Sequence, residues 1–165
     1  MIRKYTAALV QMDTQNNKKE NLDFAAACVA EAAGRGAKLV CFPEVMNLIG
    51  RNTGEGGGKE SVPGYSTERL MAAAREHGVY IHAGSVTEEI PGEKQSYNTS
   101  VVIGPSGEIL AEYRKLHMFD ITLADGTPFL ESDKVRPGSE IVTVETELGI
   151  FGLSICYDIR FPELY

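Results

Sequence analysis

Apolar residues in the first part of the chain recur at strand spacing, then at helix spacing, then at strand spacing again. Residues 5–12 predict a buried strand, and apolar side chains at helical intervals between residues 22 and 33 predict a helix. An asparagine at position 16 or 17 is a suitable cap for that helix, and Gly34 and Gly36 end it. Residues 38–42 predict a second short strand. This order favours two parallel strands joined by a right-handed crossover.

The remainder of the chain is richer in strands. Residues 51–64 are rich in glycine and polar side chains and predict a loop, after which Ser66 caps an expected helix that Gly78 ends. Residues 114–138 have no clear period, and a last helix is expected over residues 158–165. Further strands are expected at 79–86, 97–103, 108–113, 140–145 and 149–155.

These elements predict a single layered α/β domain in which helices pack against a mixed sheet. No repeat or low-complexity linker divides residues 1–165. The last apolar segment reaches Tyr165 without an evident packing partner, so we expect the fold to be incomplete at its C-terminus.

Composition narrows the class of protein further. Hydrophobic residues make up 43% of the 165 residues, and no apolar run approaches the roughly 20 residues that span a bilayer. The net charge is −7 and no run of Lys or Arg occurs, which disfavours a nucleic-acid partner. No apolar signal segment opens the chain. We therefore expect a cytoplasmic protein that binds neither membranes nor nucleic acids.

Three cysteines without a Cys-x-x-Cys pair disfavour a disulfide framework and a cysteine zinc site. Cys28 falls in the first predicted helix and Cys41 in an apolar strand, so both are expected to be small buried hydrophobic side chains. Cys156 differs because a strand runs into it and a helix is expected just beyond. A helix N-terminus favours a thiolate, and its N–H groups can receive an oxyanion. A buried structural cysteine is the alternative.

Two further residues follow predicted strands and carry useful chemistry. Glu44 comes directly after an apolar strand and a proline, where a carboxylate can serve as a general base. Lys115 follows another strand among apolar residues, where an ammonium can hold an oxyanion. On local features alone, a solvated loop acid and a surface lysine stay open. His117 is an alternative base, but we interpret it as a structural hydrogen-bonding histidine.

Together these residues belong to three motifs that occur in a fixed order. The motifs are Phe42-Pro43-Glu44, the Arg114–Asp120 segment Arg-Lys-Leu-His-Met-Phe-Asp, and the Cys156–Leu164 segment Cys-Tyr-Asp-Ile-Arg-Phe-Pro-Glu-Leu. Through them, and through the Pro137-Gly138 turn, the chain resembles the nitrilase superfamily of carbon–nitrogen hydrolases from Thr6 onward.

The resemblance implies an α-β-β-α sandwich with Glu44 as general base, Lys115 as electrostatic stabiliser and Cys156 as nucleophile. A second glutamate often supports such a site, and Glu131 matches its position. It would either orient Lys115 or position the substrate nitrogen, and a simple loop acid is its alternative.

The same resemblance implies a reaction. Cys156 attacks an amide carbonyl and forms a thioester, while Lys115 and the N–H of Tyr157 hold the oxyanion. The acid and ammonia are released without a metal or organic cofactor. A homo-oligomer of the full-length form is also implied.

The last motif is most similar to the branch that holds omega-amidases and deaminated-glutathione amidases. The implied substrate is a small amide that carries a carboxylate, which Arg160 would bind. A structural salt bridge from Arg160 to Asp158 or Glu163 is the alternative.

Rival functions remain at this stage. Within the superfamily, an N-carbamoyl amidase or a nitrilase is possible. Outside the enzymes, the alternative hypothesis is a truncated, non-catalytic module that only binds a partner. A thiol redox protein is disfavoured because no resolving cysteine lies near Cys156 in the sequence.

Overall fold

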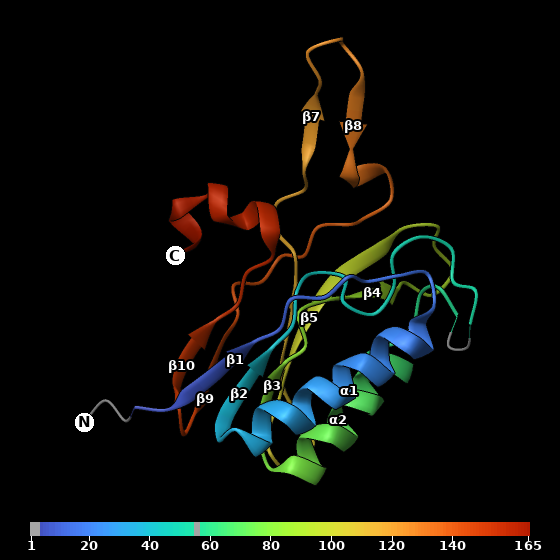
Figure 1. Ribbon diagram of the computed structural model, residues 1–165. Coiled ribbons are helices and arrows are strands. Elements are labelled where there is room, and N and C mark those ends of the chain that lie inside the picture. The colour runs from blue at the N-terminus through green and yellow to red at the C-terminus, as the bar shows by residue number, and fades with distance from the viewer. Residues whose placement is uncertain (1–3, 55–56) are drawn as a thin grey trace.

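A computed structural model describes residues 4–54 and 57–165 of the chain. A mixed six-stranded sheet carries both α-helices on one face, as Figure 1 shows. The helices are α1 (Lys18–Gly34) and α2 (Tyr65–His77). The strands of this sheet are β1 (Thr6–Leu9), β2 (Ala37–Cys41), β3 (Tyr80–His82), β4 (Val86–Glu89), β5 (Ser96–Ile103) and β6 (Ile109–Arg114).

Two small hairpins complete the strands. The pair β9 (Thr143–Thr146) and β10 (Gly149–Gly152) is antiparallel, and so is the pair β7 (Asp120–Thr122) and β8 (Pro128–Leu130). In Figure 1 the β7–β8 hairpin projects away from the body of the molecule. Short 3₁₀ helices cover Glu131–Asp133, Cys156–Arg160 and Pro162–Leu164.

The order of the central sheet is β1-β2-β3-β5-β4, with β6 paired to β5. Strands β1, β2 and β3 are parallel, whereas β5 is antiparallel to β3, β4 and β6. The expected parallel pair of the first two strands is therefore confirmed, and so is the mixed α/β class. This pairing brings the C-terminal ends of β2 and β6 and the N-terminal half of β5 together at the same end of the sheet.

Each face of the sheet has its own core. On the helix face, residues such as Leu22, Val40, Leu70 and Ile81 are fully or almost fully buried. On the other face the β9–β10 hairpin packs over β5 and β6, with a smaller core of Val102, Tyr113, Val144, Leu153 and Ile155. The site described below lies at the end of the sheet, beside both of these cores.

The first helix agrees with the sequence because its ends are determined locally. The Asn17 side chain accepts a hydrogen bond from the Glu20 N–H, as an N-cap does. The second helix ends at Gly78, whose φ of 62° suits glycine. Its start was predicted wrongly: the N-cap is Gly64, and Ser66 is buried in the first turn, where its N–H donates to Glu60.

Several strands differ from the prediction. The β1 strand is largely exposed, with Leu9 83% exposed, because it forms the edge of the sheet and pairs only with β2. The expected strand over 79–86 is split into β3 and β4 at Gly84, which has a φ of 59°. The predicted loop over 51–64 includes residues 55 and 56, which lie outside the described residues.

The C-terminal region also departs from the prediction. No α-helix forms over residues 158–165 within the described chain; a 3₁₀ helix begins at Cys156 and a second spans Pro162–Leu164. Pro162 has no N–H to continue the first of these helices. Leu130, Phe129 and Leu123 are exposed on the β7–β8 hairpin, which the sequence did not predict.

Candidate active site

The candidate residues come together at one end of the sheet, where they follow the ends of different strands. Glu44 follows β2, and Lys115 follows β6 directly. Glu131 opens the 3₁₀ helix after β8, and Cys156 opens the 3₁₀ helix after β10. Residues separated by more than 100 positions in the sequence therefore share one site.

Lys115 lies at the centre of this site and is only 2% exposed. Its Nζ is 2.9 Å from each carboxylate oxygen of Glu131 and 3.5 Å from Oε1 of Glu44. Burial by itself would lower the pKa of Lys115, but the hydrogen bonds and charges of the two glutamates outweigh it and raise that pKa. The ammonium is therefore held in its charged form.

The Lys115 backbone is fixed on both sides. Its N–H donates to the carbonyl of Asn98 over 2.9 Å, and its carbonyl accepts from the Gly138 N–H over 2.8 Å. A Cβ at position 138 would meet the Arg114 carbonyl at 2.4 Å, so the close approach of the two segments requires glycine. The Pro137-Gly138 turn thus packs directly against the strand end that carries the lysine.

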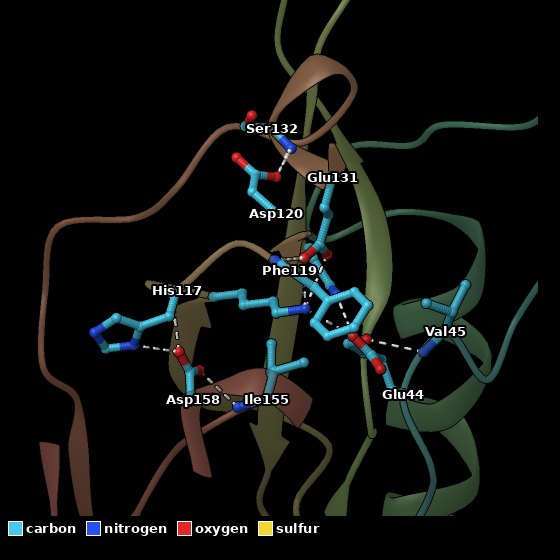
Figure 2. Close-up of polar contacts among 12 residues, drawn as sticks. Glu44, Val45, His117, Phe119, Asp120, Glu131, Ser132, Ile155 and Asp158 are labelled. Atoms are coloured by element: carbon cyan, nitrogen blue, oxygen red, sulfur yellow. Dashed lines mark hydrogen bonds and ion pairs between the residues drawn. The ribbon is translucent and has the colours of Figure 1, made fainter. Parts of the chain in front are cut away.

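Glu131 is tied to the chain as well as to the lysine. Its Oε2 accepts a hydrogen bond of 2.6 Å from the Phe119 N–H, and Figure 2 shows the carboxylate turned toward that residue. Lys115 makes contact with both oxygens. Of the two roles suggested by the resemblance, this geometry favours orienting Lys115.

The Glu44 carboxylate contacts the side chains of Asn98 and Lys115 as well as the Cys156 thiol. Its Oε1 accepts a hydrogen bond of 2.8 Å from the Asn98 side chain and lies beside the Lys115 ammonium. The side chain is 33% exposed, so the carboxylate also has open space for a reactant. Asn98 was not identified from the sequence. Its strand pattern predicts only a β5 residue, and its partners lie 54 and 17 positions away.

Cys156 is exposed and adopts an unusual backbone conformation. Its φ is 50°, in the left-handed region that residues other than glycine rarely enter. The thiol is nevertheless partly removed from water, and this partial burial is the largest cause that raises the pKa of Cys156. The charge of Glu44 and a hydrogen bond between Glu44 and the thiol raise that pKa further. The Lys115 charge lowers it but does not outweigh these effects. The α-helix that was expected to begin here and to favour a thiolate does not form, and a short 3₁₀ helix begins at Cys156 instead.

Asp158 organises the turn around Cys156. This fully buried carboxylate accepts hydrogen bonds from the Tyr113 hydroxyl (2.6 Å) and the Ile155 N–H (2.8 Å) through Oδ2. Its Oδ1 lies 3.0 Å from the His117 backbone nitrogen and 2.8 Å from His117 Nδ1. Figure 2 shows Asp158 between His117 and Ile155. The residues that flank Lys115 and Cys156 are thus bound to one carboxylate.

These contacts decide several open points. His117 is a structural histidine, as we interpreted it, because it binds Asp158 and stacks on Phe161 at 3.7 Å between ring centroids. Asp158 is occupied by these partners, and within the described residues Arg160 forms no ion pair. Arg160 is exposed one turn beyond the cysteine.

Aromatic rings line the segment that follows the nucleophile candidate. The Tyr157 ring meets Phe119 edge to face at a centroid distance of 4.9 Å and Phe161 at 5.6 Å. Tyr157, in the 3₁₀ helix that begins at Cys156, therefore packs between Phe119 and Phe161. This packing of the ring restrains the Tyr157 backbone, whose N–H is the expected oxyanion donor.

The other two cysteines lie away from this cluster. Cys28 and Cys41 are partly buried rather than fully buried, and burial raises the pKa of each thiol. The expectation that both are buried side chains is therefore confirmed only in part.

Other kinds of site have little support among residues 4–54 and 57–165. There, no group of three or more His, Cys, Asp or Glu side chains is arranged to hold a metal ion. Neither α-helix in the same part of the chain is long and apolar enough to cross a membrane.

The fold belongs to a known class. The NitFhit protein of C. elegans superposes with a TM-score of 0.84 at 29% identity, over 97% of this chain and 40% of that one. Nit3 of Saccharomyces cerevisiae, described as a member of branch 10 of the nitrilase superfamily, gives a TM-score of 0.78 at 30% identity, over 96% and 57% of the two chains.

Sequence comparison assigns the family. The model of the carbon–nitrogen hydrolase family matches residues 6–165, and the chain belongs to this family, within the nitrilase superfamily. The omega-amidase NIT2 of Danio rerio is 42% identical over 164 residues, covering 98% of this chain and 57% of that protein. The human omega-amidase NIT2 is 39% identical over 160 residues, covering 97% and 57%. The chain thus spans little more than half the length of these relatives.

Proposed function

We propose that the protein hydrolyses a non-peptide carbon–nitrogen bond and converts a small carboxylated amide to an acid and ammonia. The observation that carries this proposal is the buried Lys115 ammonium between the carboxylates of Glu131 and Glu44. Cys156 lies in the electrostatic field of all three groups. A nucleophile, a base and a fixed positive charge are the three components that acyl transfer requires.

In the first half of the proposed reaction, Glu44 takes the Cys156 proton as sulfur attacks the carbonyl carbon. The carbonyl oxygen becomes an oxyanion, which the Lys115 ammonium and the Tyr157 N–H stabilise. As the carbon–nitrogen bond breaks, Glu44 returns the proton to nitrogen. Ammonia leaves, and the acyl group remains on sulfur as a thioester.

In the second half, Glu44 takes a proton from water, which attacks the thioester carbon. As the carbon–sulfur bond breaks, Glu44 returns the proton to sulfur, so the acid is released and the thiol is restored. The raised pKa of Cys156 fits this scheme, because a thiol that is mostly protonated at neutral pH needs an adjacent base. Glu131 would keep Lys115 aimed at the oxyanion throughout.

For the substrate, the relatives named omega-amidase support an amide that also carries a carboxylate. The exposed guanidinium of Arg160 is the proposed partner of that carboxylate. A homo-oligomeric state and a cytoplasmic location remain predictions.

An ammonia-release screen over small amides tests the proposal. We expect release from amides of 2-oxo dicarboxylic acids, none from the Cys156→Ala variant, and no carbon dioxide. Carbon dioxide alongside ammonia would identify an N-carbamoyl amidase instead, and turnover of nitriles would identify a nitrilase. A protein that binds an unrelated partner and releases no ammonia from any of these compounds would be a non-catalytic module.

A further inference from the structure

Two non-glycine residues in the described chain have a left-handed backbone, and both lie at the proposed catalytic groups. Cys156 is one, and Val45, directly after Glu44, is the other; each has a φ of 50°. A β-branched residue is strongly disfavoured in this region and persists there only when surrounding contacts hold it. The turn that presents Glu44 must therefore be held by its neighbours.

Ser85 provides that hold. This fully buried residue accepts a hydrogen bond of 2.9 Å from the Val45 N–H through its hydroxyl oxygen. Its carbonyl accepts a second bond of 3.1 Å from the Met46 N–H. Two successive backbone donors after Glu44 thus end on one residue, which comes from the break between β3 and β4. In Figure 2 a dashed line marks the hydrogen bond that the Val45 nitrogen donates beside Glu44.

The preceding residue brings the two segments close enough for these bonds. A Cβ at Gly84 would lie 1.8 Å from the Pro43 carbonyl oxygen and 2.8 Å from that of Phe42. Such an approach excludes every other residue type at position 84. At Gly84 the chain leaves the direction of β3, and Ser85 thereby comes within hydrogen-bonding distance of Val45.

We propose that Ser85 is a positioning residue for the general base: by holding Val45 in its left-handed conformation, it aims the Glu44 carboxylate at Cys156. This inference rests on the proposed function of Glu44. Without the hydroxyl, the Val45 N–H loses its acceptor and the turn relaxes toward an extended φ. Glu44 then moves relative to Cys156, and a displacement of about 1 Å is enough to lower a rate by roughly a hundredfold.

The Cys156 thiol reports this displacement without any substrate. Three charged groups act on it: Glu44 and Glu131 raise its pKa, and Lys115 lowers it. If Glu44 moves away, the pKa of Cys156 falls, and alkylation by iodoacetamide reaches its half-maximal rate at a lower pH. A loss of packing that leaves Glu44, Glu131, Lys115 and the burial of the thiol unchanged does not produce this shift.

The experiment compares Ser85→Ala, Val45→Gly and the double variant with the wild type. For Ser85→Ala we expect kcat to fall by about 10- to 100-fold with little change in KM, and the alkylation midpoint to move down in pH, as in Glu44→Gln. Glycine enters the left-handed region at no cost, so the double variant should recover to within about threefold of Val45→Gly. Ser100→Ala is the matched control, because Ser100 is a fully buried serine of β5 whose hydroxyl contacts His82 instead.

An unchanged alkylation midpoint in a folded Ser85→Ala protein would overturn the inference, and so would a double variant as impaired as Ser85→Ala. If the single variant does not fold, hydrogen exchange of the Val45 amide in the wild type decides: slow exchange supports the bond to Ser85, and exchange at the rate of a free amide contradicts it. If the wild type releases no ammonia from any amide, the proposed function fails, and the alkylation midpoints alone judge the role of Ser85.

Discussion

Lys115 and Glu131 form an ion pair in which one ammonium lies 2.9 Å from both oxygens of one carboxylate. The pair is largely removed from water, because the side chains are 2% and 16% exposed. Its second carboxylate neighbour, Glu44, lies farther away at 3.5 Å. Glu131 is therefore the group that determines where the ammonium points.

We predict that Glu131→Gln lowers kcat by roughly 100-fold, the scale on which the loss of one oxyanion-stabilising group acts. The amide would keep at most one of the two contacts to Lys115, so the ammonium would lose its fixed direction. Steady-state kinetics would measure this. Asp133→Asn, an exposed carboxylate of the same 3₁₀ turn, is the control and should leave kcat unchanged.

Cys156 should carry the acyl group. Cys156→Ala is expected to remove hydrolysis, whereas Cys28→Ala and Cys41→Ala retain it, because only the Cys156 thiol is perturbed by the charges of Glu44, Lys115 and Glu131. Mass spectrometry of substrate-trapped protein should find the adduct on the peptide that contains Cys156. An adduct on either other cysteine would refute the assignment.

Glu44→Gln should have opposite effects on two rates. Hydrolysis should slow by about 100-fold or more, since general-base catalysis contributes roughly 10²- to 10⁴-fold. Alkylation of Cys156 near neutral pH should become faster, because the Glu44 charge and hydrogen bond raise the pKa of this thiol and the variant removes the charge. Kinetics of ammonia release and of iodoacetamide labelling on the same samples would check both. If the two rates fall together, Glu44 is not the neighbour of the thiol.

Asp158 should matter for stability as well as for the site. Asp158→Asn places an amide N–H₂ group against buried donors, each of which costs about 1–3 kcal/mol when left without an acceptor, so we expect a loss of about 2–5 kcal/mol. Tyr113→Phe removes only one of the hydrogen bonds and should cost about 1.5–3 kcal/mol. Denaturant unfolding measures both. Equal stability of Asp158→Asn and the wild type would contradict this account.

The Asp158 contribution should depend on pH in a defined direction. Burial would raise the pKa of Asp158, but hydrogen bonds from Tyr113, Ile155 and His117 outweigh it and hold the pKa below its ordinary value. The stabilisation is therefore complete above the unfolded-state pKa of about 4 and is lost as pH falls through the lower folded-state value. The difference in melting temperature between wild type and Asp158→Asn should be constant from pH 5 to 7 and shrink only in stronger acid.

Arg160 provides a test of substrate class. If its guanidinium binds the substrate carboxylate, Arg160→Gln should raise KM for carboxylated amides by about 10-fold or more, since charge-assisted hydrogen bonds are worth about 1.5–3 kcal/mol. KM for an uncharged amide of the same length should not change. Equal effects on both substrates would assign Arg160 a structural role.

Much of the fold could be predicted because its signals are local. The helical stripe, the Asn17 cap and the Gly78 terminus each involve residues within a few positions of one another. The same holds for the candidate residues Glu44, Lys115 and Cys156, which are marked by short motifs at the ends of strands. Local sequence also indicated that His117 would be structural.

Other features were decided only by the tertiary structure, because they depend on residues that the sheet brings together from afar. Tyr113 and His117, which bind Asp158, lie 45 and 41 positions from it in the sequence, and Ser85 lies 40 positions from Val45. No local pattern reveals which of these buried polar groups meet. The direction of the Cys156 pKa shift has the same origin: it is a sum of burial and of charges from three separate segments, and its sign exists only once those segments are packed.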